Sequence, residues 1–376
     1  MDYQTIRAGA LPVNTRFSVF STWTGAKEYH AVFIPPAGMP DVAHQLDLAT
    51  RAFPTASGHS RAVPVWRRFY MSDVVNLRPR LGDDWPAAES FIGQALPGGE
   101  RAAALCYYVD DARVERRGNT TIMQRRALQH HYYTGQFSTA AATTSAQTRA
   151  LFRALLQQTT RQGARFADDV LRAWIYINDI DNRYSDMVGA RRDFFRQVGL
   201  TPETHYIAST GIEGKSHVPR ALLHADLFAI KGIPAAQVTY LNAPDYLGRP
   251  DRYGVTFERA TLVAHGDRAL LLVSGTASID PLGNILFPLD VQAQTLRTIQ
   301  NIEALLHEGG ATATDLTHAL VYLRDPSDYP LVSSLVASAW PSVPALYTVA
   351  PVCRPGWLVE IECSALVARS SPFPPF

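Results

Sequence analysis

The sequence repeats itself, and this repeat constrains the fold more than any other feature. Residues 167–180 read ADDVLRAWIYINDI and residues 313–326 read ATDLTHALVYLRDP, with Tyr and Asp at matching places in both. In each segment an apolar run rich in β-branched and aromatic residues ends at an aspartate, which predicts a strand followed by a turn. Self-similarity at a fixed spacing indicates that one supersecondary unit occurs at least twice in the chain.

The segments around these two strands also correspond. Residues 291–308 place leucines and isoleucines on one helical face and are followed by a glycine pair, so they predict a helix. Its counterpart before the other strand covers roughly 146–160. Further matches are predicted helices at 183–199 and 331–340, and predicted alternating strands at 217–230 and 357–367.

A third and fainter copy precedes both. VWRRFYMSDVVN at 65–76 resembles RAWIYINDIDN at 172–182, with a predicted helix before it at 41–53 and an apolar strand after it at 102–109. We therefore expect an α+β fold of repeated β-β-α-β-α-β units that bury their sheets against one another as a pseudo-trimer. The expected units are a degenerate N-terminal unit at 1–117, a second unit at 118–241 and, after a Pro/Gly/Asp-rich linker, a third at 253–368.

Charge and composition argue against several classes of protein. The chain has 376 residues with 35 Lys+Arg against 34 Asp+Glu, so it lacks the basic surplus typical of nucleic-acid binders. Its 3 cysteines indicate neither a disulfide framework nor a zinc site. Without a signal peptide or a long apolar stretch, we expect a cytoplasmic protein that does not enter a membrane. Nearly all basic residues are arginine, whose guanidinium fork suits carboxylate ligands.

Several motifs carry a resemblance to a known family. SGTASID at 274–280, VYLRDPSDY at 321–329 and LVEIEC at 358–363 resemble the RidA/YjgF family. Together with RYGVTFERAT at 252–261 and STGIEG at 209–214, the ordered set resembles the chorismatases, which remove the enolpyruvyl group of chorismate. The resemblance implies RidA-like units that pack as in a trimer, with active clefts between neighbouring units.

Two positions depart from an ordinary RidA protein. Members that hydrolyse imines carry an arginine just after the Pro-Ala of a late strand, whereas Leu346 stands there in this chain. This difference disfavours imine deamination. Alignment of the second unit on the third places Leu223 opposite Glu360, so the second unit is expected to lack the carboxylate, and only one cleft is expected to be active.

Glu360 is the expected general acid. Loss of the enolpyruvyl group needs a proton on its methylene carbon, and a carboxylic acid stays protonated near neutral pH when apolar groups surround it. Glu360 lies between Val359 and Ile361 in an alternating strand, as such a buried acid would. Without the resemblance, a glutamate in this pattern is typical of a solvent-facing position.

The resemblance also gives Cys353 a role in choosing the product. Chorismatases that form 3-hydroxybenzoate carry a cysteine seven residues before the acid, as Cys353 precedes Glu360 here. Members that form a dihydroxycyclohexadiene acid carry a small inert residue instead. The implied route is attack of the ring hydroxyl on its neighbouring carbon, with a thiol assisting the opening of the resulting arene oxide. Without the resemblance, a free cysteine is typical of a small buried apolar residue.

The two carboxylates of chorismate need cationic and hydrogen-bonding partners. Candidates come from the strand entering the third unit, the turn before Glu360 and the elements of the second unit that face the cleft. A glycine would let the substrate ring approach the backbone. The expected substrate-binding residues are Arg259, Arg183, Arg354, Tyr184, Tyr240, Lys215, Ser274 and Gly275.

The sequence therefore predicts a chorismatase that forms pyruvate and 3-hydroxybenzoate, with or without some 4-hydroxybenzoate. It is expected to act without cofactor or metal, since the His130-His131 pair has no further ligand at metal-binding spacing. A monomeric pseudo-trimer and a homo-oligomer are both open. Two other functions also stay open: a RidA-like imine or enamine hydrolase, and a non-catalytic RidA-like ligand-binding protein.

Overall fold

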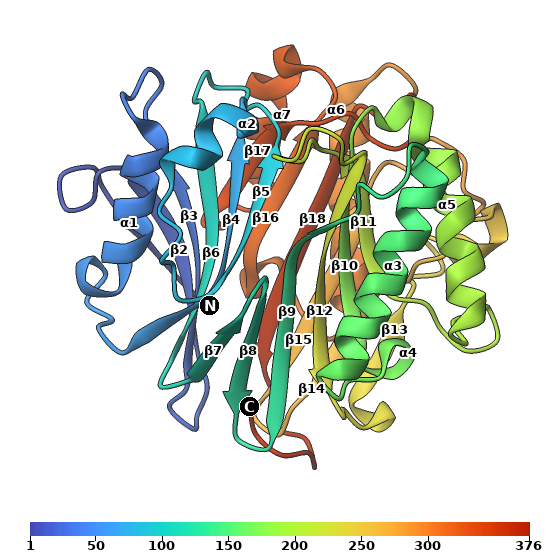
Figure 1. The fold of residues 1–376 in the computed structure, drawn as a ribbon, viewed down its shortest axis with the longest axis horizontal. Coiled ribbons are helices and arrows are strands. Elements are labelled where there is room, and N and C mark those ends of the chain that lie inside the picture. The colour runs from blue at the N-terminus through green and yellow to red at the C-terminus, as the bar shows by residue number, and fades with distance from the viewer.

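The chain consists of three consecutive units with the same order of strands and main helices (Figure 1), and a computed structural model describes all 376 residues. Unit 1 contains β1 (Asp2–Ile6), β2 (Asn14–Ser21), β3 (Lys27–Ile34), α1 (Val42–Ala56), β4 (Ala62–Met71), α2 (Val74–Leu77), β5 (Ala88–Gly93) and β6 (Ala102–Asp110). Unit 2 contains β7 (Arg113–Arg117), β8 (Thr120–Arg125), β9 (Leu128–Phe137), α3 (Thr144–Arg161), α4 (Phe166–Asp169), β10 (Val170–Ile177), α5 (Ile180–Gln197), β11 (Ala208–Glu213) and β12 (Leu223–Lys231). Unit 3 contains β13 (Val238–Leu241), β14 (Ala260–Ala264), β15 (Arg268–Thr276), α6 (Val291–Glu308), β16 (Leu316–Leu323), α7 (Tyr329–Ala339), β17 (Ala345–Val349) and β18 (Val359–Ala368).

Each unit forms one six-stranded sheet, and the strand order is identical in all three. The orders are β5-β4-β6-β3-β2-β1, β11-β10-β12-β9-β8-β7 and β17-β16-β18-β15-β14-β13. One neighbouring pair in each sheet, such as β16 with β17, is parallel, because a helix connects its two strands. The helices lie on the outer side of the sheets (Figure 1). The α+β fold of three repeated units, including the faint first copy, is therefore confirmed.

The expected boundaries between the units are wrong by a few residues. Arg113–Arg117, expected in the first unit, is β7 and pairs with β8 of the second sheet. Val238–Leu241, expected in the second unit, is β13 and pairs with β14 of the third. Both are edge strands whose ladder exists only with the unit that follows, so local composition did not reveal their membership. Each unit thus has one more strand at either end than the β-β-α-β-α-β pattern expected.

Strand pairing fixes which residues are equivalent between units. Tyr322 of β16 is paired with Glu360 of β18, and the equivalent Tyr176 of β10 is paired with His224 of β12. The expected match of Leu223 with Glu360 is therefore wrong by one residue, because a shift of one residue moves a side chain to the other face of a sheet. The counterpart of Glu360 is His224, so the second unit still lacks a carboxylate at this position.

Buried ion pairs join each unit to the next. The pairs are Arg68 with Asp226 at 2.7 Å (units 1 and 2), Arg172 with Glu362 at 2.9 Å (units 2 and 3) and Arg268 with Glu28 (units 3 and 1). The largest cluster of buried apolar residues draws on all three units and lies where their sheets meet. Removing one partner of a buried pair costs about 3–5 kcal/mol, so these pairs oppose any sliding of one unit past another.

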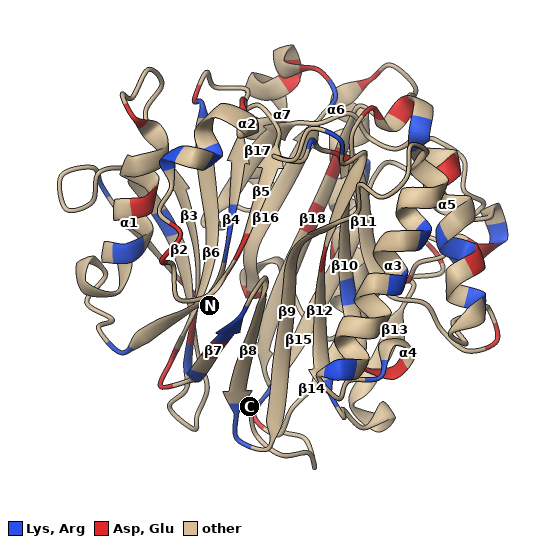
Figure 2. Cartoon of the chain, viewed as in Figure 1, with Lys and Arg blue, Asp and Glu red and all other residues tan.

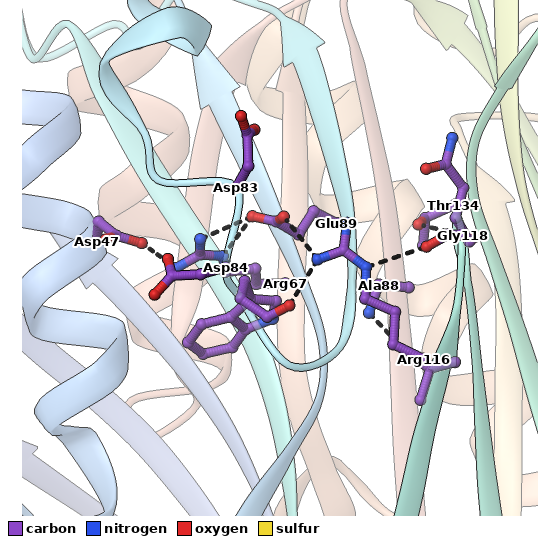
Figure 3. Close-up of polar contacts among 12 residues, drawn as sticks. Asp47, Arg67, Asp83, Asp84, Ala88, Glu89, Arg116, Gly118 and Thr134 are labelled. Carbon is purple, nitrogen blue, oxygen red and sulfur yellow. Dashed lines mark hydrogen bonds and ion pairs between the residues drawn. The ribbon is translucent and has the colours of Figure 1, made fainter.

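A second charged network fixes the start of unit 2 on unit 1 (Figure 3). The guanidinium group of Arg67 contacts Glu89 at 2.7 Å and Asp47 at 2.7 Å. Glu89 also contacts Arg116 of β7 at 3.4 Å, and Arg116 donates a hydrogen bond to the backbone oxygen of Trp85. The edge strand β7 is thereby held against unit 1 although it belongs to the second sheet.

Charges of both signs are interspersed on the outer helices α1 and α5 (Figure 2). This distribution agrees with the nearly equal numbers of acidic and basic residues in the chain. None of the helices combines the length and the apolar character that crossing a membrane requires.

Candidate active site

A cavity lies between units 2 and 3, and the space among its lining atoms, open solvent included, is about 520 Å³. Unit 3 contributes β15, β18 and the loops that precede β14 and β18, and unit 2 contributes α5 and β11. The cavity is lined by Tyr184, Arg191, Ser209, Gly211, Tyr253, Val255, Phe257, Arg259, Gly275, Ala277, Ile279, Cys353, Arg354, Trp357 and Glu360.

The Glu360 carboxyl group is a buried acid that faces this cavity. The residue is 4% exposed, and no side chain or backbone group of the protein hydrogen-bonds its carboxyl group. Burial raises the pKa of Glu360 to about 8, and the negative charge of Glu362 adds to the rise, while Arg172 and Arg259 act against it. The carboxyl group is therefore mostly protonated at neutral pH and available as a proton donor.

Gly275 makes room for this acid. The pairing of β15 with β18 is irregular between Val273 and Thr276, which is the geometry of a β-bulge. A side chain at Gly275 would collide with the carboxyl group of Glu360. The amide of Gly275 donates a hydrogen bond of 2.9 Å to the hydroxyl oxygen of Thr210 on β11. The bulge thus places the backbone of β15 in contact with both the Glu360 carboxyl group and Thr210 of unit 2.

Three arginines line the cavity, and none of them forms an ion pair with a carboxylate. Arg191 of α5 is 2% exposed and contacts the hydroxyl of Ser209 at 3.4 Å. Arg259 donates to the hydroxyl of Tyr253 at 2.6 Å, and Arg354 donates to a backbone carbonyl at 2.8 Å. A buried guanidinium group without an anionic partner is costly. The cavity therefore favours an anionic ligand, and three cations suit more than one negative charge.

The thiol of Cys353 lies in the same cavity. Burial raises its pKa to about 12, and the charge of Glu360 adds to the rise. The hydroxyl of Tyr184 on α5 lies near this thiol in the cavity. The thiol is therefore protonated at neutral pH, which suits a proton donor rather than a thiolate nucleophile.

The structure brings most of the expected residues together and leaves some outside. Those that line the cavity are Glu360, Cys353, Arg259, Arg354, Tyr184 and Gly275. Ser274 is a supporting residue: its buried hydroxyl accepts a 2.9 Å hydrogen bond from the amide of Ser209 and does not line the cavity.

Arg183, Lys215 and Tyr240 do not reach the cavity. Arg183 lies in the first turn of α5, where it donates to the backbone oxygen of Asn178 at 2.8 Å. The backbone of Lys215 bridges to unit 1, at the other interface of unit 2. The ring of Tyr240 stacks on His205 at 4.5 Å on edge strand β13. The place of each residue along the chain does not fix the side of the element on which its side chain lies.

Sequence reasoning missed several residues that line the cavity. Arg191 carried a usable signal, since it lies seven residues after Tyr184 on α5 and two helical turns return a side chain to the same face. Tyr253, Phe257 and Trp357 come from loops, where no periodicity predicts direction. No group of three or more His, Cys, Asp or Glu side chains lies together as metal ligands would.

The argument that this chain lacks the arginine of imine hydrolases used Leu346, which lies at a different interface from Glu360. Leu346 lies on β17, whose end bridges to unit 1 through Val349 and Ala95, away from Glu360. Leu346 pairs with Leu320, and the equivalent pair in unit 2 is Thr210 with Trp174. At the interface that holds Glu360, the equivalent position is therefore occupied by Thr210, which is not an arginine either.

Comparisons with known proteins agree with this architecture. Residues 261–367 match the family model described as Endoribonuclease L-PSP. A solved chorismatase structure matches with 19% identity and a TM-score of 0.66, covering 93% of this chain and 99% of that one. A YjgF/YER057c/UK114 family member from Mycobacterium tuberculosis is 26% identical over 35% of this chain and 99% of its own, with a TM-score of 0.28. A Rid family protein from Yersinia pestis is 23% identical over 34% of this chain and 98% of its own, with a TM-score of 0.29. The chain therefore has the fold of that chorismatase structure, and its third unit matches the Endoribonuclease L-PSP model.

Proposed function

We propose that this protein cleaves chorismate to 3-hydroxybenzoate and pyruvate in the cavity between units 2 and 3. The observation that carries the proposal is one cavity that holds three arginines without ion-pair partners and a protonated Glu360. Chorismate is a small dianion with an acid-labile enol ether, so it needs both features. The solved structure that shares the fold is described as a chorismatase, which supports the same substrate.

Glu360 starts the reaction by donating its proton to the enol methylene carbon. Protonation leaves positive charge on the carbon that bears the ether oxygen, and this weakens the bond from that oxygen to the ring. The pKa of about 8 keeps the proton on Glu360 until the substrate binds. Arg191, Arg259 and Arg354 hold the two carboxylates, so the methylene carbon is oriented toward the acid.

The ring hydroxyl then attacks the neighbouring carbon while the ether bond to the ring breaks. Pyruvate leaves with the ether oxygen as its carbonyl oxygen, and an arene oxide remains. The proton of the hydroxyl passes to the carboxylate of Glu360, which restores the acid. The two products contain every atom of chorismate, so the route consumes no water.

Cys353 acts on the arene oxide. Its thiol, protonated because burial raises its pKa to about 12, gives a proton to the epoxide oxygen as one carbon–oxygen bond opens. The thiolate then takes the proton that the ring loses on becoming aromatic. Opening of one bond gives 3-hydroxybenzoate, and opening of the other gives 4-hydroxybenzoate, so some of the second product is compatible with this site.

The two other functions are less well supported. An imine or enamine hydrolase of the RidA type uses an arginine at the position that Thr210 occupies at this interface. A purely ligand-binding protein would not need a buried and protonated carboxyl group that faces its cavity. Neither function accounts for the presence of the Glu360 carboxyl group and the Cys353 thiol in one cavity.

The test is incubation of the purified protein with chorismate, without added cofactor or metal, followed by separation of the aromatic products. We expect 3-hydroxybenzoate and pyruvate in equal amounts. A Cys353→Ala variant should still consume chorismate but form less 3-hydroxybenzoate. Cys363→Ala is the matched control, since Cys363 is buried on the face of β18 opposite to that of Glu360 and does not line the cavity. Absence of pyruvate would refute the proposed function.

A further inference from the structure

A second carboxylate, Glu362, lies next to the site, and the mechanism gives it no role. It is two residues from Glu360 on the same face of β18 and 4% exposed, yet it does not line the cavity. Its carboxylate accepts hydrogen bonds from Arg172 at 2.9 Å and from the indole of Trp174 at 3.0 Å, and a third from the hydroxyl of Thr210. All three donors belong to unit 2.

Thr210 links this carboxylate to the catalytic bulge. Its hydroxyl oxygen accepts the amide proton of Gly275 at 2.9 Å while the hydroxyl proton goes to Glu362. Gly275 in turn lies against the carboxyl group of Glu360. A continuous line of contacts therefore runs from the buried Arg172–Glu362 ion pair through Thr210 and Gly275 to the acid.

The interface between units 1 and 2 contains the same arrangement without an acid. Asp226, equivalent to Glu362 by strand pairing, contacts Arg68 at 2.7 Å and accepts from the hydroxyl of Ser90 at 2.9 Å. There the amide of the bulge residue Gly135 donates directly to Asp226 at 2.8 Å. Of these two interfaces, only the one that holds Glu360 has a hydroxyl group, that of Thr210, between the buried carboxylate and the amide of the bulge.

The third interface has its buried ion pair elsewhere, between Arg268 and Glu28, and shows that the positions equivalent to Glu362 and Thr210 can be apolar. At the equivalent positions, between units 3 and 1, the residues are Leu105, Leu320 and Leu346, each 1% exposed or less. Strands β3 and β6 pair there without a bulge. Apolar residues often stabilise such positions as well as a buried ion pair does. The network at Glu362 therefore calls for a reason beyond cohesion of the units.

The reason is the effect of the charge of Glu362 on the protonation of Glu360. Two residues apart on one strand face, the two glutamates are separated by roughly 6.6 Å along the strand. The negative charge of Glu362 raises the pKa of Glu360, and the positive charges of Arg172 and Arg259 lower it. The other titratable groups near Glu360 come from α5, β16 and the loops before β14 and β18, and they are Tyr184, Arg191, Tyr253, Tyr322, Cys353 and Arg354.

We propose that Glu362 and Thr210 are positioning residues of this site, which fix the Gly275 bulge against Glu360 and place beside it a carboxylate that is paired with Arg172. Glu362 does not touch the substrate. It acts through Thr210 on geometry and through space on the protonation of the acid. The proposal rests on the proposed function for its kinetic consequences, but the state of Glu360 can be measured without turnover.

The first experiment follows the carboxyl carbon of Glu360 by NMR in protein labelled with carbon-13 glutamate, with the resonance assigned by its loss in Glu360→Gln. In Glu362→Gln, we expect the titration of Glu360 to move about 1 pH unit or more toward lower pH, since a like charge is removed and Arg172 is left unpaired. Asp226→Asn, the same change at the matched interface, should lower thermal stability but leave that titration in place. An unchanged titration in a folded Glu362→Gln variant would overturn the role of its charge.

The second experiment addresses Thr210. In Thr210→Val we expect faster hydrogen exchange of the Gly275 amide and at least about tenfold lower kcat, with the pH limb unchanged, because the hydroxyl carries no charge. Thr210→Ser should restore both. Ser90→Ala removes the matched hydroxyl at the other interface and should affect neither. If wild-type protein releases no pyruvate, the proposed function fails, while the NMR titration and the amide exchange still decide this proposal. Equal exchange in Thr210→Val and wild type would overturn the role of Thr210.

Discussion

His224 of β12 occupies the strand position that Glu360 occupies in β18, and each lies opposite an equivalent tyrosine. Burial lowers the pKa of His224 to about 3, so this imidazole is neutral at neutral pH and holds no proton to donate as an acid. The cleft between units 1 and 2 therefore has the bulge and the buried ion pair of the active cleft but no proton donor. One chain with three similar units thus has a single candidate site for acid catalysis.

Replacement of the acid should abolish the reaction without unfolding the protein. Glu360→Gln keeps the size of the side chain but removes the transferable proton, so we expect kcat to fall by about 10²–10⁴-fold. The melting temperature should stay close to that of the wild type, since no protein group bonds this carboxyl group. Coupled detection of pyruvate measures the rate, and His224→Gln at the equivalent position serves as the control that keeps activity. Turnover in Glu360→Gln at the wild-type rate would exclude this acid.

Activity should fall with rising pH because the acid must be protonated. Burial raises the pKa of Glu360 to about 8, so the protonated form dominates below that pH and is lost above it. We therefore expect kcat/KM to be nearly constant from pH 6 to 7 and to decline tenfold per unit well above pH 8. A profile that rises through this range would show that the carboxylate form is the active one.

The bulge glycine should tolerate no side chain. In Gly275→Ala the added methyl group would meet the carboxyl group of Glu360 and the methyl group of Thr210, so the acid must move. We expect at least about 10²-fold lower kcat/KM, as misplacement of reacting groups usually causes. Gly189→Ala on α5 is the matched control, because a methyl group there meets no atom within 4 Å. That control should keep full activity and gain up to about 1 kcal/mol of stability.

The arginines of the cavity should determine substrate affinity. Arg191→Gln and Arg259→Gln each remove a charged donor to a substrate carboxylate, and loss of such a bond costs about 1.5–3 kcal/mol, or roughly 10–150-fold in KM. Arg183→Gln, eight residues earlier on the same helix as Arg191, should leave KM unchanged because Arg183 lies outside the cavity. Steady-state kinetics on the three variants separates these expectations. A raised KM in Arg183→Gln alone would reverse the assignment.

The repeated fold could be predicted from the sequence because the copies of the unit can be aligned with one another within the chain. Tyr70, Tyr176 and Tyr322 mark the same central strand in every unit, and all three are fully buried. Edge strands such as β7 were misplaced, since an edge strand is defined by a partner that comes later in the chain. The expected alignment of β12 on β18 was wrong by one residue. Leu223 and His224 are both buried, so the sequence alone does not show which of them occupies the position of Glu360.

The catalytic part of the candidate site was predicted through the resemblance to a known family. Alternation along β18 alone is typical of a solvent-facing glutamate, and only the family motif made Glu360 the expected acid. Arg183 and Lys215 failed because the nearest motif says nothing about which interface a side chain faces. The pairing of Thr210 with Glu362 across two units could not be predicted at all, because it depends on how separate sheets meet.

The most direct test of the account is the reaction of the wild-type protein with chorismate in water enriched in oxygen-18. The intramolecular route predicts equal amounts of pyruvate and 3-hydroxybenzoate, with no label in the hydroxybenzoate. A labelled dihydroxycyclohexadiene acid would show instead that water attacks the ring, and no release of pyruvate would contradict cleavage of chorismate altogether.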